Sequence, residues 1–503
     1  MLSDMDTESQ LSESEEQVPE NGREAKGFRT FMKRPITLIS TAAVVGAAVL
    51  GVVVLGDLSR TDTGTATVAS SRSTSSTGNG NAVAGGSPPS GAPGGSGSGG
   101  SGSGGAPGGS GSGGSSTQTY TDTGAYTLNG GTASKSGTTF TASGTDESGV
   151  LVAGGGVLTL TDVTLSTSGA SKSSDESSFY GLDSGLLVYK SGKVTIDGGS
   201  YSTTGLGANT VFAYGSSAAI TLSGATVKAT GAYSHGLMAS GGGTITATNT
   251  TVATQGHNSA ALATDRGSGT ITFTGGSLST TGTDAPLIYS TGSITATNTT
   301  GTATTAEAVV VEGSNAVTLA NSTLTGKKNG VMLYQSFSGD AQVGTSQFTM
   351  TGGSLTATGG DAFYVKNTKA TVLLKGGAKV TESSGRLIDA VNSGIVTFTA
   401  QGETLTGNIV TDNTSSATVL LEDSSSLTGM IDKAALTLDS SSKWIVTANS
   451  TVTTLKGAVI SGDEVTNIVG NGHNVYYSKS SSANSYLGGK TYKLADGGEL
   501  IAE

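Results

Sequence analysis

The chain has 503 residues, of which 80 are glycine and none is cysteine, and its formal net charge is −11. Charged residues make up 13% of the chain and aromatic residues 5%. This composition lacks the basic field that nucleic-acid binding requires, so we expect no nucleic-acid partner. The absence of cysteine excludes disulfides and thiolate metal sites, and nothing in the composition indicates a cofactor.

The first predicted element is a membrane-spanning helix at residues 36–56, read as ITLISTAAVVGAAVLGVVVLG. At about 1.5 Å per residue it would cover roughly the 30 Å of a bilayer's hydrocarbon core. Basic residues precede it at Lys26, Arg29, Lys33 and Arg34. The positive-inside tendency then predicts a single-pass membrane protein with residues 1–35 in the cytoplasm and the rest outside. The alternative is a cleaved signal peptide and a secreted protein.

Residues 57–117 are rich in glycine, serine and proline, as in SPPSGAPGGSGSGGSGSGG. Such a composition buries almost nothing and is typical of a disordered, flexible linker. We expect a spacer with no specific partner, and a cell-wall-associating role is the alternative.

Two phrases repeat through the rest of the chain. One is exemplified by ITFTGGSLSTTG (271–282), which matches ITATNTTVATQG (245–256) and ITATNTTGTATT (294–305). The other is a short apolar strand such as SAALATDRG or APLIYSTG. Ile271 and Phe273 alternate with Thr272 and Thr274, so the first phrase predicts a strand with one buried and one exposed face.

A repeat of about 24 residues cannot bury its apolar stripe alone, whereas stacked repeats can. We therefore predict an all-β chain folded as a parallel β-helix solenoid, a monomeric rod of ten to twelve rungs about 4.8 Å apart. The main helix is expected at 118–400, with further rungs and a cap at 401–503.

The repeats SHGLMASGGGTITATNTTVATQGHNSAALATDRGSGTITFTGGSLSTTG (234–282) resemble the rungs of right-handed parallel β-helix surface proteins. These include pectate-lyase-like solenoids and autotransporter passengers, and many are described as adhesins. The resemblance covers roughly residues 120–503. It implies a secreted or surface-displayed protein. The membrane barrel that follows autotransporter passengers is not evident in the sequence, because no alternating strands of spanning length follow the repeats.

Enzymes of this resemblance that cut acidic polysaccharides use clustered aspartates and a calcium site, and we find no such cluster in the sequence. Acids and amides recur just before the second phrase's strand, where polar turn residues commonly satisfy backbone groups. A cation ladder is the alternative, with Asp284 and Glu307 one rung apart. The column consists of Asp183, Asn258, Asp284, Glu307, Asn329 and Asp361. His235 and His257 lie near the same bend, and we predict surface turn histidines rather than a metal or general-base site.

Outward threonines form the first candidate binding surface, on three consecutive predicted rungs. They resemble the flat ice-binding faces of β-helical antifreeze proteins, but threonine also simply favours exposed strands. We predict a generic polar face, with glycan contact as one use and ice binding as the alternative. The residues are Thr246, Thr248, Thr272, Thr274, Thr295 and Thr297.

Two insertions lengthen the rungs, at 169–185 and 336–347. Phe179 and Tyr180 in the first are the second candidate binding surface, because aromatic faces stack on sugars. We nevertheless favour a solvated loop that tucks both aromatics onto the rod.

Together these features predict a membrane-tethered, surface-exposed β-helix with a non-catalytic binding or adhesive role toward carbohydrate or another surface partner. The alternatives are a polysaccharide-acting enzyme and a purely structural spacer, because a fold does not determine a function.

Overall fold

The structure is a computed structural model, which describes residues 68–71, 119–336 and 340–503. The predicted cytoplasmic tail at 1–35 and membrane helix at 36–56 lie outside the described residues. Within the described ranges, no helix has the length and apolar character to cross a membrane.

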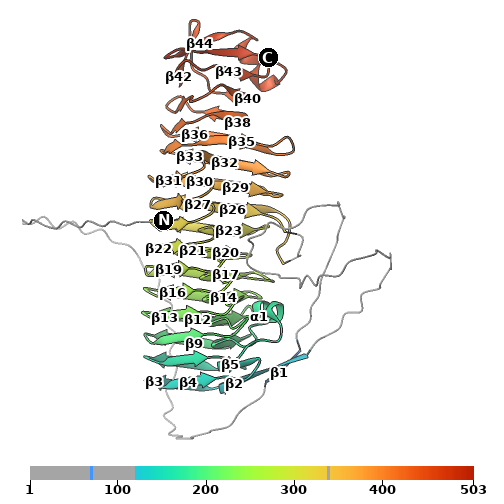
Figure 1. Cartoon of the computed structure of the whole chain (residues 1–503), viewed down its shortest axis with the longest axis vertical. Coiled ribbons are helices and arrows are strands. Elements are labelled where there is room, and N and C mark those ends of the chain that lie inside the picture. The colour runs from blue at the N-terminus through green and yellow to red at the C-terminus, as the bar shows by residue number, and fades with distance from the viewer. Residues whose placement is uncertain (1–67, 72–118, 337–339) are drawn as a thin grey trace, which may run out of the picture. The chain divides into compact units, whose positions relative to one another are not determined.

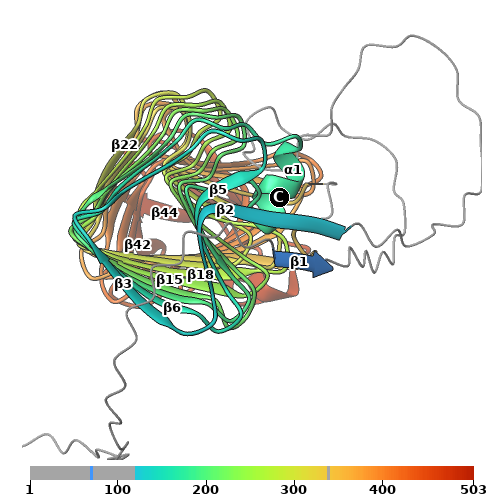
Figure 2. The same ribbon diagram turned by 90° about the horizontal axis from the view of Figure 1, so that it is seen from below.

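Residues 119–336 and 340–503 form a parallel β solenoid of about 15 turns with almost no helix, whose rungs stack along one axis (Figure 1). The predicted ten to twelve rungs were too few, because strands continue to pair through the C-terminal region. Each typical rung has three strands on three faces, here named face A, face B and face C (Figure 2).

Face A follows the second repeated phrase, and each strand pairs in parallel with the next. Its strands are β2 (Thr119–Asn129), β5 (Glu147–Ala153), β8 (Leu186–Tyr189), β11 (Val211–Tyr214), β14 (Leu237–Ser240), β17 (Leu262–Thr264), β20 (Ile288–Ser290), β23 (Val309–Glu312), β26 (Val331–Tyr334), β29 (Phe363–Lys366), β32 (Arg386–Val391) and β35 (Asn408–Thr411).

Face B follows the first half of the other phrase. Its strands are β3 (Thr132–Ser136), β6 (Val157–Thr161), β9 (Lys193–Asp197), β12 (Ala219–Ser223), β15 (Gly243–Thr248), β18 (Gly269–Thr274), β21 (Ser293–Thr297), β24 (Ala316–Ala320), β27 (Thr345–Thr351), β30 (Lys369–Lys375), β33 (Ile395–Gln401) and β36 (Ser416–Glu422).

Face C is a separate parallel sheet. Its strands are β4 (Thr139–Ala142), β7 (Thr164–Thr167), β10 (Ser200–Thr203), β13 (Thr226–Ala229), β16 (Thr251–Thr254), β19 (Ser277–Thr280), β22 (Thr300–Ala303), β25 (Thr323–Gly326), β28 (Ser354–Ala357) and β31 (Lys379–Glu382).

The interior is a continuous ladder of apolar side chains. Ile245 lies in register with Ile271, which lies in register with Ile294. All three are buried, as are Phe273 and Leu278. The predicted assignment of Ile271, Phe273 and Leu278 to the core is therefore confirmed. Stacking of like residues in register explains why the sequence repeats, since a slip of one residue would turn every apolar side chain outward.

A column of glycines lies where the chain leaves face C. A Cβ on Gly256 would lie 1.8 Å from the carbonyl oxygen of Gly231, and a Cβ on Gly282 would lie 1.7 Å from that of Gly256. Neighbouring rungs thus approach so closely here that no side chain fits between them. Part of the high glycine content follows from this contact.

The N-terminal rung ends the solenoid with an inward lysine. Lys135 of β3 lies in register with Leu160, a core residue, and its Nζ lies 5.0 Å from the centre of the Tyr126 ring. An inward charge at the edge of a sheet disfavours pairing with another chain. Strand β1 (Val68–Ser71) pairs antiparallel with β2 of this rung. These four residues fall in the predicted linker and extend the sheet edge through backbone pairing. The rest of 57–117 lies outside the described residues, so the linker stays a prediction.

The C-terminal region continues the stack and then closes it with shorter, partly antiparallel strands. The buried indole of Trp444 donates a hydrogen bond from Nε1 to the carbonyl of Gly429 at 2.9 Å. The elements are β34 (Thr404–Thr406), β37 (Ser426–Thr428), β38 (Ile431–Leu438), β39 (Lys443–Ile445), β40 (Ser450–Lys456), β41 (Ile460–Ser461), β42 (Glu464–Val469), β43 (Val475–Tyr477), the 3-10 helix η1 (Ser482–Leu487), β44 (Tyr492–Ala495) and β45 (Glu499–Ala502).

Candidate functional site

The six predicted threonines lie side by side on the outer surface of face B. Thr246 is in register with Thr272, which is in register with Thr295, and the second column behaves in the same way. The second column is Thr248, Thr274 and Thr297. Every one of the six is exposed or half-buried. The structure thus gives the ladder that the sequence predicted, and its binding role stays a prediction.

The ladder belongs to a larger surface, which we name the threonine grid. It comprises the outward residues of β12, β15, β18, β21 and β24, and it contains only threonine, serine and alanine. Its members are Ala219, Thr221, Ser223, Thr244, Thr246, Thr248, Thr270, Thr272, Thr274, Ser293, Thr295, Thr297, Ala316, Thr318 and Ala320. With strands about 4.8 Å apart and about 3.3 Å per residue, the grid measures roughly 19 by 13 Å.

The threonine grid is uncharged and rigid. Charges begin at its lower border, where β9 presents Lys193 and Asp197 in register with β12. Among the described residues, no hydrogen-bond partner contacts the hydroxyls of Thr246, Thr272 or Thr295. β-branched side chains hold few χ1 rotamers, so these hydroxyls and methyls form a fixed pattern available to solvent or a ligand.

The first insertion carries a short helix against face A. Helix α1 (Ser174–Tyr180) begins at the Ser173 N-cap, whose side chain accepts a hydrogen bond from the Glu176 backbone N–H at 3.2 Å. It ends at Gly181 in the left-handed region, with φ 83°. Figures 1 and 2 show the helix beside the strands of face A. The insertion is thus an ordered cover for this face.

Phe179 and Tyr180 do not form an exposed tip. They are only 6% and 5% exposed. The Tyr180 ring meets the Tyr214 ring edge-on at 5.5 Å, and the Arg266 guanidinium lies 3.8 Å above the Phe179 ring. The candidate binding tip at Phe179 and Tyr180 was therefore wrong, because the outer side of face A is itself apolar and accepts the rings. The structure confirms the favoured expectation that the loop tucks both aromatics onto the rod.

Four rungs of face A contribute to a buried group of polar side chains, which we name the acid–tyrosine cluster: Asp265, Tyr289, Glu312 and Tyr334, each about 1% exposed. Glu312 Oε2 accepts hydrogen bonds from the hydroxyls of Tyr289 at 2.5 Å and Tyr334 at 2.6 Å. The Ser336 hydroxyl donates to its other oxygen. One carboxylate therefore joins three hydroxyls at the start of the second insertion.

Asp265 links the same cluster to helix α1. Its Oδ2 accepts a hydrogen bond from the Ser178 hydroxyl at 2.5 Å. Burial, the largest cause, and the nearby Asp340 carboxylate together raise the pKa of Asp265 to about 7, although the hydrogen bond from Ser178 acts to lower it. The adjacent Arg266 bonds Asp340 Oδ1 at 2.7 Å. Arg266 thus bridges the two insertions, which lie far apart in the sequence.

The acid–tyrosine cluster was missed in the sequence, yet a signal for it exists. Polar residues recur at the last outward position of the second phrase or at the position just after it, namely at Tyr214, Ser240, Asp265, Glu312 and Tyr334. Outward residues on this face were expected to meet solvent. The sequence did not show that two insertions would fold over them, and the acids are too far apart in the chain to be recognised as a cluster.

The predicted turn column is mainly structural. Asp183, Asn258 and Asp284 adopt φ values between 51° and 59°, the left-handed conformation that favours aspartate and asparagine at bends. The cation ladder alternative is not supported at Asp284 and Glu307. The Lys328 ammonium bonds Asp284 Oδ1 at 2.6 Å, and Asn329 Nδ2 donates to Glu307 Oε1 at 3.3 Å. The Lys328 ammonium thus occupies the place beside Asp284 that a bound cation would take.

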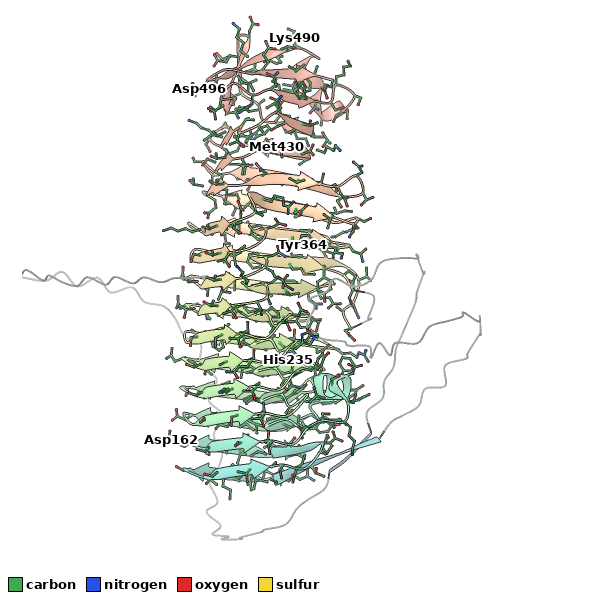
Figure 3. The ribbon with its side chains drawn as sticks, in the orientation of Figure 1. Asp162, His235, Tyr364, Met430, Lys490 and Asp496 are labelled. Atoms are coloured by element: carbon green, nitrogen blue, oxygen red, sulfur yellow. The ribbon has the colours of Figure 1, made fainter. Side chains whose placement is uncertain are left out.

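The two histidines have different surroundings. His235 (labelled in Figure 3) is buried, its Nδ1 accepts a hydrogen bond from the Ala260 backbone N–H at 2.9 Å, and burial lowers its pKa to about 4. The prediction of a surface turn residue was therefore wrong for His235, whose neutral ring helps to hold two rungs together. His257 is exposed and its Nδ1 contacts the Thr283 hydroxyl at 2.9 Å.

Across the described residues, no three histidine or acidic side chains are arranged to hold a metal ion. No protein-family model matches the chain, and a search of curated proteins finds no relative. The surfaces described above are therefore the features of the molecule that indicate a function.

Proposed function

We propose that the protein is a non-catalytic binding rod that contacts carbohydrate surfaces through the threonine grid. The observation that carries the proposal is the uncharged, in-register set of hydroxyls and methyls on β12, β15, β18, β21 and β24. Sugar rings also present hydroxyls beside apolar C–H groups. A repeating glycan can meet the same pair of groups on successive rungs, so weak contacts add as in other multivalent binding.

Rigidity of the grid supports the proposal further. Binding orders side chains at an interface, and each long side chain that is immobilised costs about 0.5–1.5 kcal/mol. Threonines on a paired strand have already lost most of that freedom. The grid therefore loses little conformational entropy when a ligand binds, which favours binding through many similar groups.

Display at a membrane completes the proposed function. The apolar segment 36–56 would anchor the chain, the 57–117 segment would act as a spacer, and the solenoid would extend outward as an adhesin-like rod with right-handed rungs of about 24 residues. Protease treatment of intact cells tests this arrangement: the solenoid should be accessible to added protease, whereas an epitope fused before residue 36 should be protected.

The binding test compares the full-length chain with two grid variants and one control variant on an array of neutral and acidic glycans. Thr272→Glu and Thr295→Glu place charges in the centre of the grid and should abolish binding. Thr397→Glu is the matched control, because Thr397 is an exposed outward residue of β33, outside the grid. Binding that survives both grid substitutions would contradict the proposal, and binding to no glycan would favour a structural spacer.

A polysaccharide-acting enzyme is the second candidate, and the acid–tyrosine cluster is the observation that favours it. A buried carboxyl with a pKa of about 7 is suited to act as a general acid at neutral pH. Glu312 lies on the same outer face of the sheet. Both groups are buried beneath the insertions, so a substrate would require these to move. Turnover of any glycan that is lost in Asp265→Asn and Glu312→Gln, and kept in Thr272→Glu, would establish this function.

A further inference from the structure

A hollow of about 380 Å³ opens at the turns that lead from face A to face B on three neighbouring rungs. These turns join β8 to β9, β11 to β12 and β14 to β15. We name it the turn hollow, and its lining residues are Lys190, Ser191, Tyr214, Gly215, Ser216, Ser217 and Gly241. It is lined by one cationic residue, three serines, two glycines and one tyrosine.

Lys190 occupies a backbone position where glycine would be less strained. It has a φ of 54°. The register of β8, β11 and β14 places Gly215 and Gly241 at the equivalent turn position on the next two rungs, and both also have positive φ. A non-glycine residue in this region costs roughly 1–2 kcal/mol. Such strain persists where the surrounding structure holds the backbone in place, and it is often found at functional sites.

The ammonium of Lys190 is available at the surface. The residue is exposed, and its Nζ lies 5.0 Å from the centre of the Tyr189 ring, which fixes the direction of the side chain. Within the described part of the chain, no carboxylate forms an ion pair with it. A hydrogen-bonded anion would therefore supply a partner that the described residues do not.

The neighbouring turn adds neutral donors. The turn closes with a hydrogen bond from the Ala218 N–H to the Gly215 carbonyl at 2.9 Å. Between them, the backbone N–H groups and hydroxyls of Ser216 and Ser217 have no hydrogen-bond partner among the described residues, and both residues are exposed. Successive unpaired N–H groups at a turn form a concavity that suits an anion.

We infer that the turn hollow binds the carboxylate of an acidic glycan, with Lys190 as the charged partner and the Ser216–Ser217 turn as the neutral donors. Attraction of anions by overall charge does not account for such binding, because the chain carries a net charge of −11. The hollow adjoins the threonine grid, since Ser217 lies two residues before the grid member Ala219. The anion site rests on its own geometry, whereas the choice of a glycan as its carrier rests on the proposed function.

The test measures the binding of the full-length protein, by isothermal titration calorimetry, to galacturonic acid oligomers and to galactose oligomers of the same length. We expect the acidic oligomers to bind about tenfold or more tightly, as charge-assisted hydrogen bonds imply. Lys190→Asn should remove that preference. Because asparagine tolerates the left-handed conformation better than lysine, this variant should unfold at the same temperature as the parent or a higher one. Lys193→Gln, which removes an exposed charge three residues away, should keep the preference.

Equal binding of the two oligomers, or a preference that survives Lys190→Asn, overturns the inference. Acetate alone is the third ligand. The assignment to a glycan is overturned if acetate binds, Lys190→Asn abolishes acetate binding, and the acidic oligomers bind no more tightly than the neutral ones. The grid variant Thr272→Glu separates the two proposals. Retained acid preference in that variant, with unchanged binding of neutral oligomers, supports the hollow and contradicts the grid.

Discussion

The buried carboxyl of Asp265 should make the stability of the rod depend on pH in a direction opposite to that of most carboxylates. Its pKa is raised from 3.8 to about 7 by burial, the largest cause. Below pH 3.8 both the folded and the unfolded chain hold this proton, and between pH 3.8 and 7 only the folded chain does. The free energy of unfolding therefore decreases as pH rises through this window and is lowest above pH 7.

The magnitude follows from the shift. One pKa unit corresponds to 1.36 kcal/mol, so a shift from 3.8 to about 7 corresponds to about 4 kcal/mol between acidic and neutral pH. His235 acts in the opposite direction, because its pKa is lowered to about 4 and the folded state loses stability as pH falls below 6.5. Comparison of the parent with Asp265→Asn cancels the histidine contribution and isolates the carboxyl.

The assay is urea unfolding followed by circular dichroism at pH 4, 5, 6, 7 and 8. Relative to Asp265→Asn, the parent should lose roughly 1.4 kcal/mol for each pH unit between 4 and 7, and no more above that range. Parallel pH profiles for the two proteins would refute the reasoning. That result would mean that Asp265 ionises with an ordinary pKa and that the cover formed by α1 and the second insertion admits water.

Three further predictions concern the solenoid itself. Gly256→Ala should lower the free energy of unfolding by about 1–3 kcal/mol or more through overpacking against the Gly231 carbonyl. The control Gly224→Ala, whose Cβ meets nothing within 4 Å, should lower it by only about 1 kcal/mol because of its positive φ. Equal losses in the two variants would contradict the close contact between rungs at Gly256. Lys135→Leu should cause end-to-end association, because it removes the inward charge from the open edge of the sheet. Analytical ultracentrifugation would detect this as a mass that rises with concentration, with Lys193→Leu as the control. A purely monomeric Lys135→Leu would refute the role of the charge. Glu312→Ala removes the carboxylate that accepts hydrogen bonds from Tyr289, Tyr334 and Ser336, which should lower the free energy of unfolding by about 2 kcal/mol or more. Limited proteolysis should therefore cut near residues 336–345 faster in this variant than in the parent or in the control Glu464→Ala. Unchanged cleavage would show that the cluster does not hold the insertion.

The sequence predicted the solenoid because its signals are local and repeated. Alternation of Ile271 and Phe273 with Thr272 and Thr274 assigns each side chain to a face, and a repeat that cannot bury its own apolar stripe must stack. The same reasoning placed six threonines on one surface. These features depend on the spacing of residues within a rung, which a single sequence displays directly.

The covered side of face A could not be predicted in this way. Its burial depends on contacts between residues far apart in the chain, such as Arg266 with Asp340 and Ser178 with Asp265. Neither pair follows from periodicity. The favoured interpretation of Phe179 and Tyr180, that the loop tucks them onto the rod, was confirmed, but their partners Arg266 and Tyr214 could not be named from the sequence. The turn hollow was missed because it forms where the turns of three rungs stack. Two of its donors are also backbone N–H groups, at Ser216 and Ser217, which a sequence does not reveal.

The regular register on face B also bears on how the protein could change over evolution or by engineering. Ile245 and Ile271 occupy equivalent places in successive rungs, so removal of residues 245–270 would join Thr244 to Ile271 with every later side chain still on its proper face. A partial deletion would rotate the remainder and expose the core. The length of the solenoid can therefore change by whole rungs while both of its ends stay the same. Duplication or loss of the DNA that encodes one rung would lengthen or shorten the rod without disturbing its core.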